Sequence, residues 1–188
     1  MSPRVGLSVL LDDDLRAAQL PLFEEGIVEA IEWTIDLEMP APGWAAPEWV
    51  GPLLAAYAAE GALYAHGVHF SPLSAVLEER QRAWLEEARI VVARRGPRHV
   101  SEHFGVMTAP GFSRGAPLPQ PFTAAVTRVG RDRLAQIADA VERPVGVENL
   151  ALAMSRDDAL AHGDQIGALV ADADRFVVLD LHNLFCQA

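Results

Sequence analysis

The segment Arg143-Pro144-Val145-Gly146-Val147-Glu148-Asn149 decides the fold class of this sequence. Its apolar run, Val145 to Val147, is short and lies between two longer segments with helical periodicity, residues 122–142 and 156–173. A short apolar run in this setting is typical of a buried strand in a parallel sheet. The run ends on a carboxylate and an amide, so polar side chains stand where the strand leaves the core.

The same pattern recurs along the whole chain. It predicts strands at residues 4–10, 30–37, 62–66, 99–103, 144–148 and 175–180, and helices at residues 15–29, 48–60, 74–95, 122–142 and 156–173. Strict alternation of strand and helix indicates βαβ units and a parallel sheet, either doubly wound or closed as a barrel. Residues 39–47 and 108–121, rich in proline and glycine, are predicted to be loops.

Two nucleotide-binding folds are excluded by the first turn. Gly6 is the only glycine near the end of the first predicted strand, and neither GxGxxG nor GxxxxGK[ST] occurs. The predicted strand ends follow one another at about the spacing of one βα unit in a barrel that takes about 250 residues for eight units. We therefore expect an α/β fold of the TIM (β/α)8 type, truncated after about six strands, in a single domain over residues 1–188.

Composition narrows the function classes. The chain has 188 residues, 26 of them acidic and 15 basic, which gives a formal net charge of −11. An acidic protein is a poor partner for nucleic acid, whose phosphates need a basic face. No segment reaches the roughly 20 apolar residues of a membrane span, and the single cysteine, Cys186, fits a reducing compartment. We expect a cytoplasmic protein.

Residue types that bind metals follow the predicted strands. They are His66 after the third strand, Glu102 and His103 after the fourth, Glu148 and Asn149 after the fifth, and Asp180, His182 and Asn183 after the sixth, with Asp36, Glu38 and His69 as further candidates. The carboxyl ends of parallel strands meet at one mouth of a barrel, so these side chains are expected to converge. Imidazole and carboxylate without thiolate suit iron, manganese or zinc, and several carboxylates in one cleft need cations to neutralise them.

Each residue alone also has a structural interpretation. His66 could cap a strand end, and Glu102 with His103 could be a solvated pair in a loop. Glu148 and Asp180 each follow an apolar run, where a carboxylate has to be paired if it is not functional. His69 is the weaker histidine because strand alternation aims it differently. Only their coincidence at one end of the sheet favours a metal site.

The ordered set of short motifs resembles one known family. His66-Gly67, Ser101-Glu102-His103, Pro117-Leu118-Pro119, residues 143–149 and Leu179-Asp180-Leu181-His182-Asn183 are similar to motifs of the multinuclear non-heme iron-dependent oxidases. Some members of that family modify cysteines in ribosomal peptides such as methanobactin. The resemblance implies a xylose-isomerase-like barrel that holds two or three iron ions.

The resemblance also implies roles for individual residues. His66, His103, Glu148 and Asp180 match metal ligands, and Asn149 and Asn183 match groups that orient them. Glu102 stands where the family usually has Asp, while His69 and His182 occupy less constrained positions.

The activity implied by the resemblance is oxidation of a peptide cysteine with dioxygen, with a separate peptide-recognition protein presenting the substrate. Two alternatives stay open: a divalent-metal isomerase or hydrolase of the xylose-isomerase-like group, using zinc, manganese or magnesium, and a non-catalytic fragment that binds metal or a partner. Since six strands leave unpaired sheet edges, association with another copy or a complementary fragment is also expected.

Overall fold

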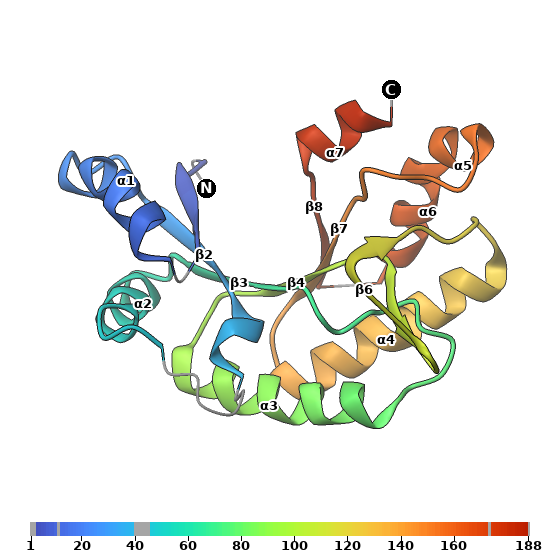
Figure 1. Cartoon of the computed structure of the whole chain (residues 1–188), viewed down its shortest axis with the longest axis horizontal. Helices are drawn as coiled ribbons and strands as arrows, with labels where there is room; N and C mark the ends of the chain where they lie inside the picture. The colour runs from blue at the N-terminus through green and yellow to red at the C-terminus, as the bar shows by residue number, and fades with distance from the viewer. Residues whose placement is uncertain (1–2, 11, 40–45, 173, 188) are drawn as a thin grey trace.

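The computed structural model describes residues 3–10, 12–39, 46–172 and 174–187. Its main element is a six-stranded parallel sheet in the order β1-β2-β3-β4-β7-β8 (Figure 1). The strands are β1 (Gly6–Val9), β2 (Ala30–Thr34), β3 (Leu63–Gly67), β4 (Val100–His103), β7 (Val145–Glu148) and β8 (Arg175–Val178). All six predicted strands are present, and each pairs with the next predicted strand along the chain. The expected α/β fold with a parallel sheet is confirmed.

Helices connect the strands in the expected alternation. They are α1 (Asp13–Glu24), the 3-10 helix η1 (Ile35–Glu38), α2 (Val50–Ala59), α3 (Glu79–Arg95), α4 (Ala124–Val141), α5 (Arg156–Leu160), α6 (His162–Leu169) and α7 (Leu181–Cys186). Local chemistry sets several ends: Glu78 and Gln81 form a capping box before α3, and Gly96, at φ 67°, ends that helix. None of the helices in the described ranges combines the length and apolar composition needed to cross a bilayer.

Three local predictions were wrong. Residues 108–121 do not form a plain loop, because β5 (Val106–Ala109) and β6 (Phe112–Leu118) pair as an antiparallel hairpin. The predicted helix at 156–173 is two helices, α5 and α6, and the predicted strand at 30–37 ends at Thr34, where η1 begins. Helix α7 was not predicted. Most of the predicted loop at 39–47 lies outside the described residues.

The two faces of the sheet differ in chemistry. Strand register aligns side chains across the sheet, so alternate residues form rows on opposite faces. The apolar rows are buried in the core, which includes Ile31, Trp33, Leu63, Ala65, Val100, Val145 and Val147. The other face carries polar rows, including Glu32, Tyr64, His66, Ser101, His103 and Glu148.

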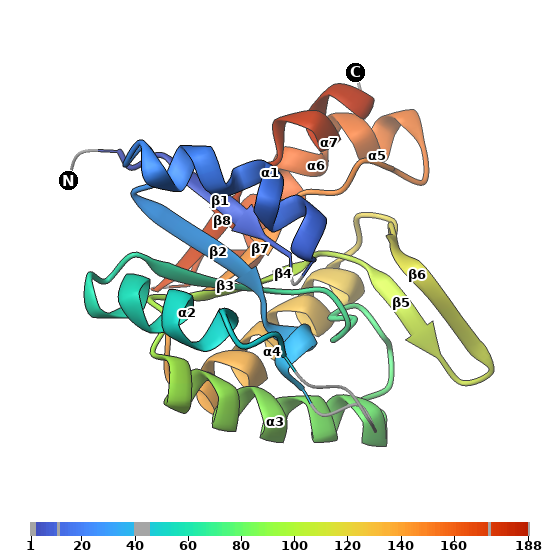
Figure 2. The same ribbon diagram turned by 60° about the vertical axis from the view of Figure 1, so that its left-hand side comes forward.

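The sheet is an open arc rather than a closed barrel. Strands β1 and β8 are its two edges, and each has one neighbour within the described sheet. Figure 1 shows α3 and α4 beneath the central strands and the two edge strands rising on either side. Figure 2 shows hairpin β5–β6 projecting beyond the sheet from the end of β4. The arrangement is that of an incomplete TIM-type barrel.

Candidate metal centre

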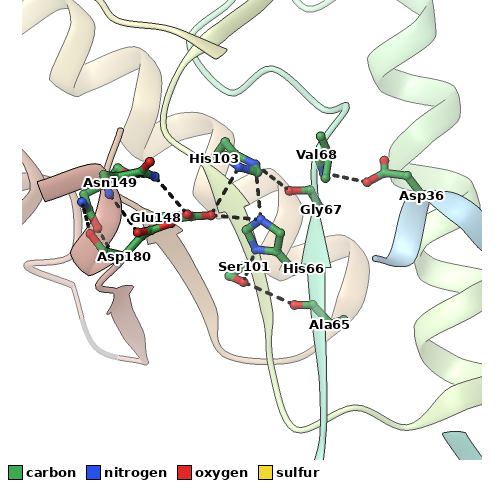
Figure 3. Close-up of polar contacts among 11 residues, drawn as sticks. Asp36, Ala65, His66, Gly67, Val68, Ser101, His103, Glu148, Asn149 and Asp180 are labelled. Carbon is green, nitrogen blue, oxygen red and sulfur yellow. Dashed lines mark hydrogen bonds and ion pairs between the residues drawn. The ribbon is translucent and has the colours of Figure 1, made fainter. Parts of the chain in front are cut away.

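Three strand ends bring two imidazoles and one carboxylate together (Figure 3). His66 Nε2 lies 3.1 Å and His103 Nε2 lies 3.3 Å from Oε2 of Glu148. His66 Nε2 also lies 3.2 Å from His103 Nδ1. One candidate ligand atom from each residue lies within 4.8 Å of the others. The sequence-predicted convergence is therefore observed for three of the residues.

Strand register explains why these three side chains meet. His66 pairs with Ser101 across β3 and β4, and His103 pairs with Glu148 across β4 and β7. Paired residues on parallel strands project to the same face, so His66, Ser101, His103 and Glu148 all lie on the polar face. The ends of neighbouring strands thereby form one site without any help from loops.

Ser101 orients the His66 ring. The Ser101 hydroxyl lies 2.8 Å from His66 Nδ1 and also 3.4 Å from the carbonyl of Ala65, to which it donates. The Ser101 oxygen can then accept the Nδ1 proton of His66, which leaves Nε2 facing Glu148. A histidine held through one nitrogen and open at the other is the usual arrangement of a metal ligand.

The electrostatics of the cluster favour a cation. Burial alone lowers the pKa of His66, but its hydrogen bond with Glu148 and the nearby carboxylates of Glu32 and Asp36 together raise that pKa above its ordinary value. Burial and the charge of His66 lower the pKa of His103. The site therefore holds a positive charge between its carboxylate and its imidazoles, and a metal ion would take the place of that charge.

The three residues fit a metal ion in donor type and spacing. Ligand atoms bound to one ion at about 2.0 to 2.2 Å lie roughly 3 Å apart, and the contacts between these donors are 3.1 to 3.3 Å. Two nitrogens and one oxygen at one point leave open coordination positions, as a reactive centre requires. His66 and Glu148 are each 8% exposed, so the group is shielded but not sealed.

Asp180 and the two asparagines form the neighbouring wall. The Asn149 side chain bonds both the amide and the carbonyl of Asp180, at 2.7 and 2.9 Å. Asn183 donates to Glu148 Oε1 at 3.2 Å, and the Asp180 carboxylate caps α7 by accepting from the Asn183 amide. That hydrogen bond lowers the pKa of Asp180, and its carboxylate also interacts with Glu148. Asp180 thus lies beside the cluster without belonging to the group of three.

Glu102 does not join the cluster. It alternates with Ser101 and His103 on β4, so its fully buried carboxylate projects from the opposite face toward Gly67 and Trp84. Burial and the Asp36 carboxylate raise the pKa of Glu102 well above its ordinary value. Its oxygen Oε1 accepts from the amides of Phe70 and Ser71, which is a role in the loop rather than at the metal centre.

The remaining candidates lie apart from the three. Asp36 accepts from the Val68 amide and the Trp84 indole, and the nearest contact of His69 is 3.8 Å to that carboxylate. Glu38 forms ion pairs with Arg94 and Arg95. His182 is exposed on α7, and its ring lies 3.7 Å from the sulfur of Cys186.

Two residues with roles at the site were missed by sequence reasoning. Ser101 stands in the quoted Ser-Glu-His motif, yet it was assigned no part, although alternation from His103 places it on the same face. Gly67 is required because a Cβ there would lie 2.6 Å from Glu102 Oε2. Its signal was the glycine that directly follows His66 in the strand.

Comparison with solved structures agrees with the observed fold. The crystal structure of endonuclease IV from Thermus thermophilus is similar to 98% of this chain and to 65% of its own chain, with a TM-score of 0.58 and 16% sequence identity. A xylose isomerase domain protein from Planctomyces limnophilus covers 88% of this chain and 57% of its own, with a TM-score of 0.47 and 16% identity. Fold and site together define an incomplete TIM-type barrel with a candidate metal centre at its strand ends.

Sequence comparison gives the family. The profile described as RiPP precursor modification enzyme MbnB/TglH/ChrH matches residues 37–188, so the chain belongs to this family of enzymes that modify ribosomally made peptides. A UPF0276 protein of Acaryochloris marina (strain MBIC 11017) is 28% identical over 124 residues, 65% of this chain. The chain spans 44% of that relative's length. The resemblance inferred from the motifs is confirmed.

Proposed function

We propose that this protein is a non-heme iron-dependent oxidase that modifies a cysteine of a ribosomally made peptide with dioxygen. The observation that carries this proposal is the cluster of His66, His103 and Glu148 in a chain of the family described above. Two imidazoles and a carboxylate with open positions are the donor set of many non-heme iron sites.

The roles of the residues follow from their positions. His66, His103 and Glu148 hold the first ion, and Asp180, beside Glu148, supplies a carboxylate for a second. Asn149 fixes the Asp180 backbone, and Asn183 holds the Glu148 oxygen that faces away from the histidines. Iron bound here would fix a substrate thiolate and provide the redox centre that reduces dioxygen.

The peptide is proposed to reach this site with the help of a recognition protein. The site lies at the carboxyl ends of the strands, which is the end where TIM-type barrels bind substrates. No general base is assigned, because a thiol bound to a metal loses its proton without one.

Metal analysis of protein purified without oxygen tests the proposal. We expect iron in stoichiometric amount in the wild-type protein and a strong loss in Glu148→Gln, which keeps nearly the same shape but removes a negative charge that offsets the cation. Glu38→Gln is the matched control, since the Glu38 carboxylate is buried in ion pairs elsewhere, and it should keep its iron.

The identity of the metal and the use of oxygen separate the alternatives. Oxygen consumption that depends on both iron and a cysteine-containing precursor peptide supports the oxidase. Zinc or manganese in place of iron, without oxygen consumption, would favour a divalent-metal isomerase or hydrolase. Equal iron in wild type and Glu148→Gln would remove Glu148 from the site.

A further inference from the structure

The loop between β3 and α3 is held by buried side chains from other elements. Glu102 on β4 accepts from the amides of Phe70 and Ser71, at 2.8 and 3.3 Å. Gln81 on α3, also fully buried, donates to the carbonyls of Phe70 and Ser71, at 3.0 and 3.1 Å. Asp36 accepts from the amide of Val68, at 2.6 Å. The residues that follow His66 are thereby fixed on both their amide and carbonyl sides.

Ser71 connects this loop to hairpin β5–β6. Its backbone lies in the left-handed region, at φ 65°, where a residue other than glycine is held only by its surroundings. Its hydroxyl oxygen accepts from the amides of Met107 and Thr108 on β5, at 2.7 and 3.1 Å. Ser74 adds a bond to the Thr108 carbonyl. The hairpin is attached to the loop through β5, and Ser71 is the junction.

Stability alone does not account for Glu102 in this position. The residue is 0% exposed, and its oxygen Oε2 has no hydrogen-bond partner within the described residues. A well-packed apolar side chain is usually at least as stabilising as a buried carboxylate with an unpaired oxygen. Gly67 is also confined to glycine by that oxygen. The feature that an apolar residue could not reproduce is the pair of bonds to the loop.

We propose that Glu102 is a positioning residue for the metal centre. It follows Ser101, which orients His66, and precedes His103, and its carboxylate ties the loop after His66 to β4. It thus fixes the separation of the two histidines from the opposite face of the sheet and, through Ser71, holds the hairpin in place. This inference rests on the proposed metal centre and assigns Glu102 no contact with the metal.

Cobalt binding tests the effect on the histidines. Co²⁺ is the probe because its visible absorption reports both affinity and ligand geometry. Glu102→Ala should weaken Co²⁺ binding about tenfold or more and alter the spectrum, as the loss of an orienting group does. Glu102→Gln, which keeps an acceptor oxygen for the loop, should restore both. Glu38→Ala, which removes a buried carboxylate paired with Arg94 and Arg95, is the matched control and should bind as wild type.

Amide hydrogen exchange tests the connection to the hairpin without any metal. Glu102→Ala should expose the amides of Met107 and Thr108, which Glu102 does not contact, together with those of Phe70 and Ser71. Ser71→Ala should expose Met107 and Thr108 while leaving Co²⁺ affinity unchanged, and it serves as a second variant if Glu102→Ala folds poorly.

The outcomes are distinct. Wild-type Co²⁺ affinity in Glu102→Ala overturns the positioning role, and unchanged protection of Met107 and Thr108 in both variants overturns the connection through Ser71. Absence of Co²⁺ binding in the wild-type protein would instead contradict the proposed function, while the exchange experiment would still decide the role of Glu102 in the hairpin.

Discussion

At the scale of single residues, the Ser101 hydroxyl decides which nitrogen of His66 is available. It is buried, and its only described side-chain partner is His66 Nδ1. Without it, the ring could rotate or change tautomer, and Nε2 would no longer be held toward Glu148. The effect belongs to orientation rather than charge, because a hydroxyl contributes no net charge to the cluster.

Ser101→Ala is therefore expected to weaken metal binding by about tenfold with little loss of fold stability. Isothermal titration with Fe²⁺ under anaerobic conditions measures the change. Ser8→Ala, on the exposed part of β1, is the control and should bind as wild type. An unchanged affinity in Ser101→Ala would show that packing alone orients His66.

His99 gives the clearest pH dependence outside the cluster. Its ring stacks with those of Tyr64 and Phe176, and burial, together with the positive charges of Arg98 and His66, lowers its pKa to about 4. The folded protein therefore binds fewer protons at His99 than the unfolded chain does between about pH 4 and the unfolded value near 6.5. Stability contributed by the neutral ring is present above about pH 6.5 and is lost as the pH falls toward 4.

We expect this loss to reach about 1 to 2 kcal/mol, after discounting for the partial exposure of His99. His99→Phe keeps an aromatic ring and removes the titration, so its unfolding free energy should fall less between pH 7 and pH 4. Urea titrations of both proteins at the two pH values measure the difference. Parallel pH profiles would contradict the assignment.

At the scale of elements, the contact between β7 and β8 depends on one glycine. A Cβ at Gly146 would lie 2.3 Å from the Phe176 ring, which packs directly on the strand. The two residues are partners in the register of the sheet. Strand β8 carries the segment that leads to Asp180, so this contact sets the distance of that carboxylate from the histidines.

Gly146→Ala is expected to lower the unfolding free energy by about 1 to 3 kcal/mol, because the Phe176 ring has to move in a packed region. Gly167→Ala is the matched control. It lies in α6 with open space around its Cα, so the better helix propensity of alanine should raise stability by up to about 1 kcal/mol. Thermal unfolding of both variants checks the opposite signs.

Element by element, sequence reasoning succeeded where periodicity was strong. All six parallel strands were predicted because each is a short apolar run between long helices. Hairpin β5–β6 was missed, since Pro110-Gly111 and Pro117-Leu118-Pro119 indicate a loop, and only tertiary bonds such as those from Ser71 fix the strand β5. Helix α7 was missed because it has just six residues and begins at the Asp180 cap.

The site could be predicted only as far as strand ends can be placed. His66, His103 and Glu148 converge because they end neighbouring strands in the same phase. Glu102 is one residue out of phase with His103, which sends its carboxylate to the opposite face. Motif similarity identified the Ser101-Glu102-His103 segment but could not tell these two faces apart.

At the scale of the whole molecule, one edge of the sheet exposes a set of apolar side chains. This β8 edge patch consists of Val177, Leu179, Leu181, Leu184 and Phe185, which are 39 to 77% exposed. Strand β8 has a single neighbour in the described sheet, so backbone groups and apolar side chains are both free to pair at this edge.

We expect the 188-residue chain to self-associate in a concentration-dependent way through this patch. Phe185→Lys should shift sedimentation toward the monomer, because a charge is costly to bury in an apolar contact. Ile90→Lys, at an exposed apolar position on α3, is the control and should leave association unchanged. A wild-type monomer at all concentrations would contradict the prediction.

Because the polar and apolar rows alternate along the same strands, neighbouring residues carry different obligations. On β3, Leu63 and Ala65 belong to the core, while Tyr64 and His66 belong to the polar face. A saturation library read out once for abundance and once for metal loading should therefore give two sensitivity patterns that interleave along β3 and β4 with a period of two. The polar face can thus accept new side chains, and with them new chemistry, while the core that keeps the protein folded stays intact.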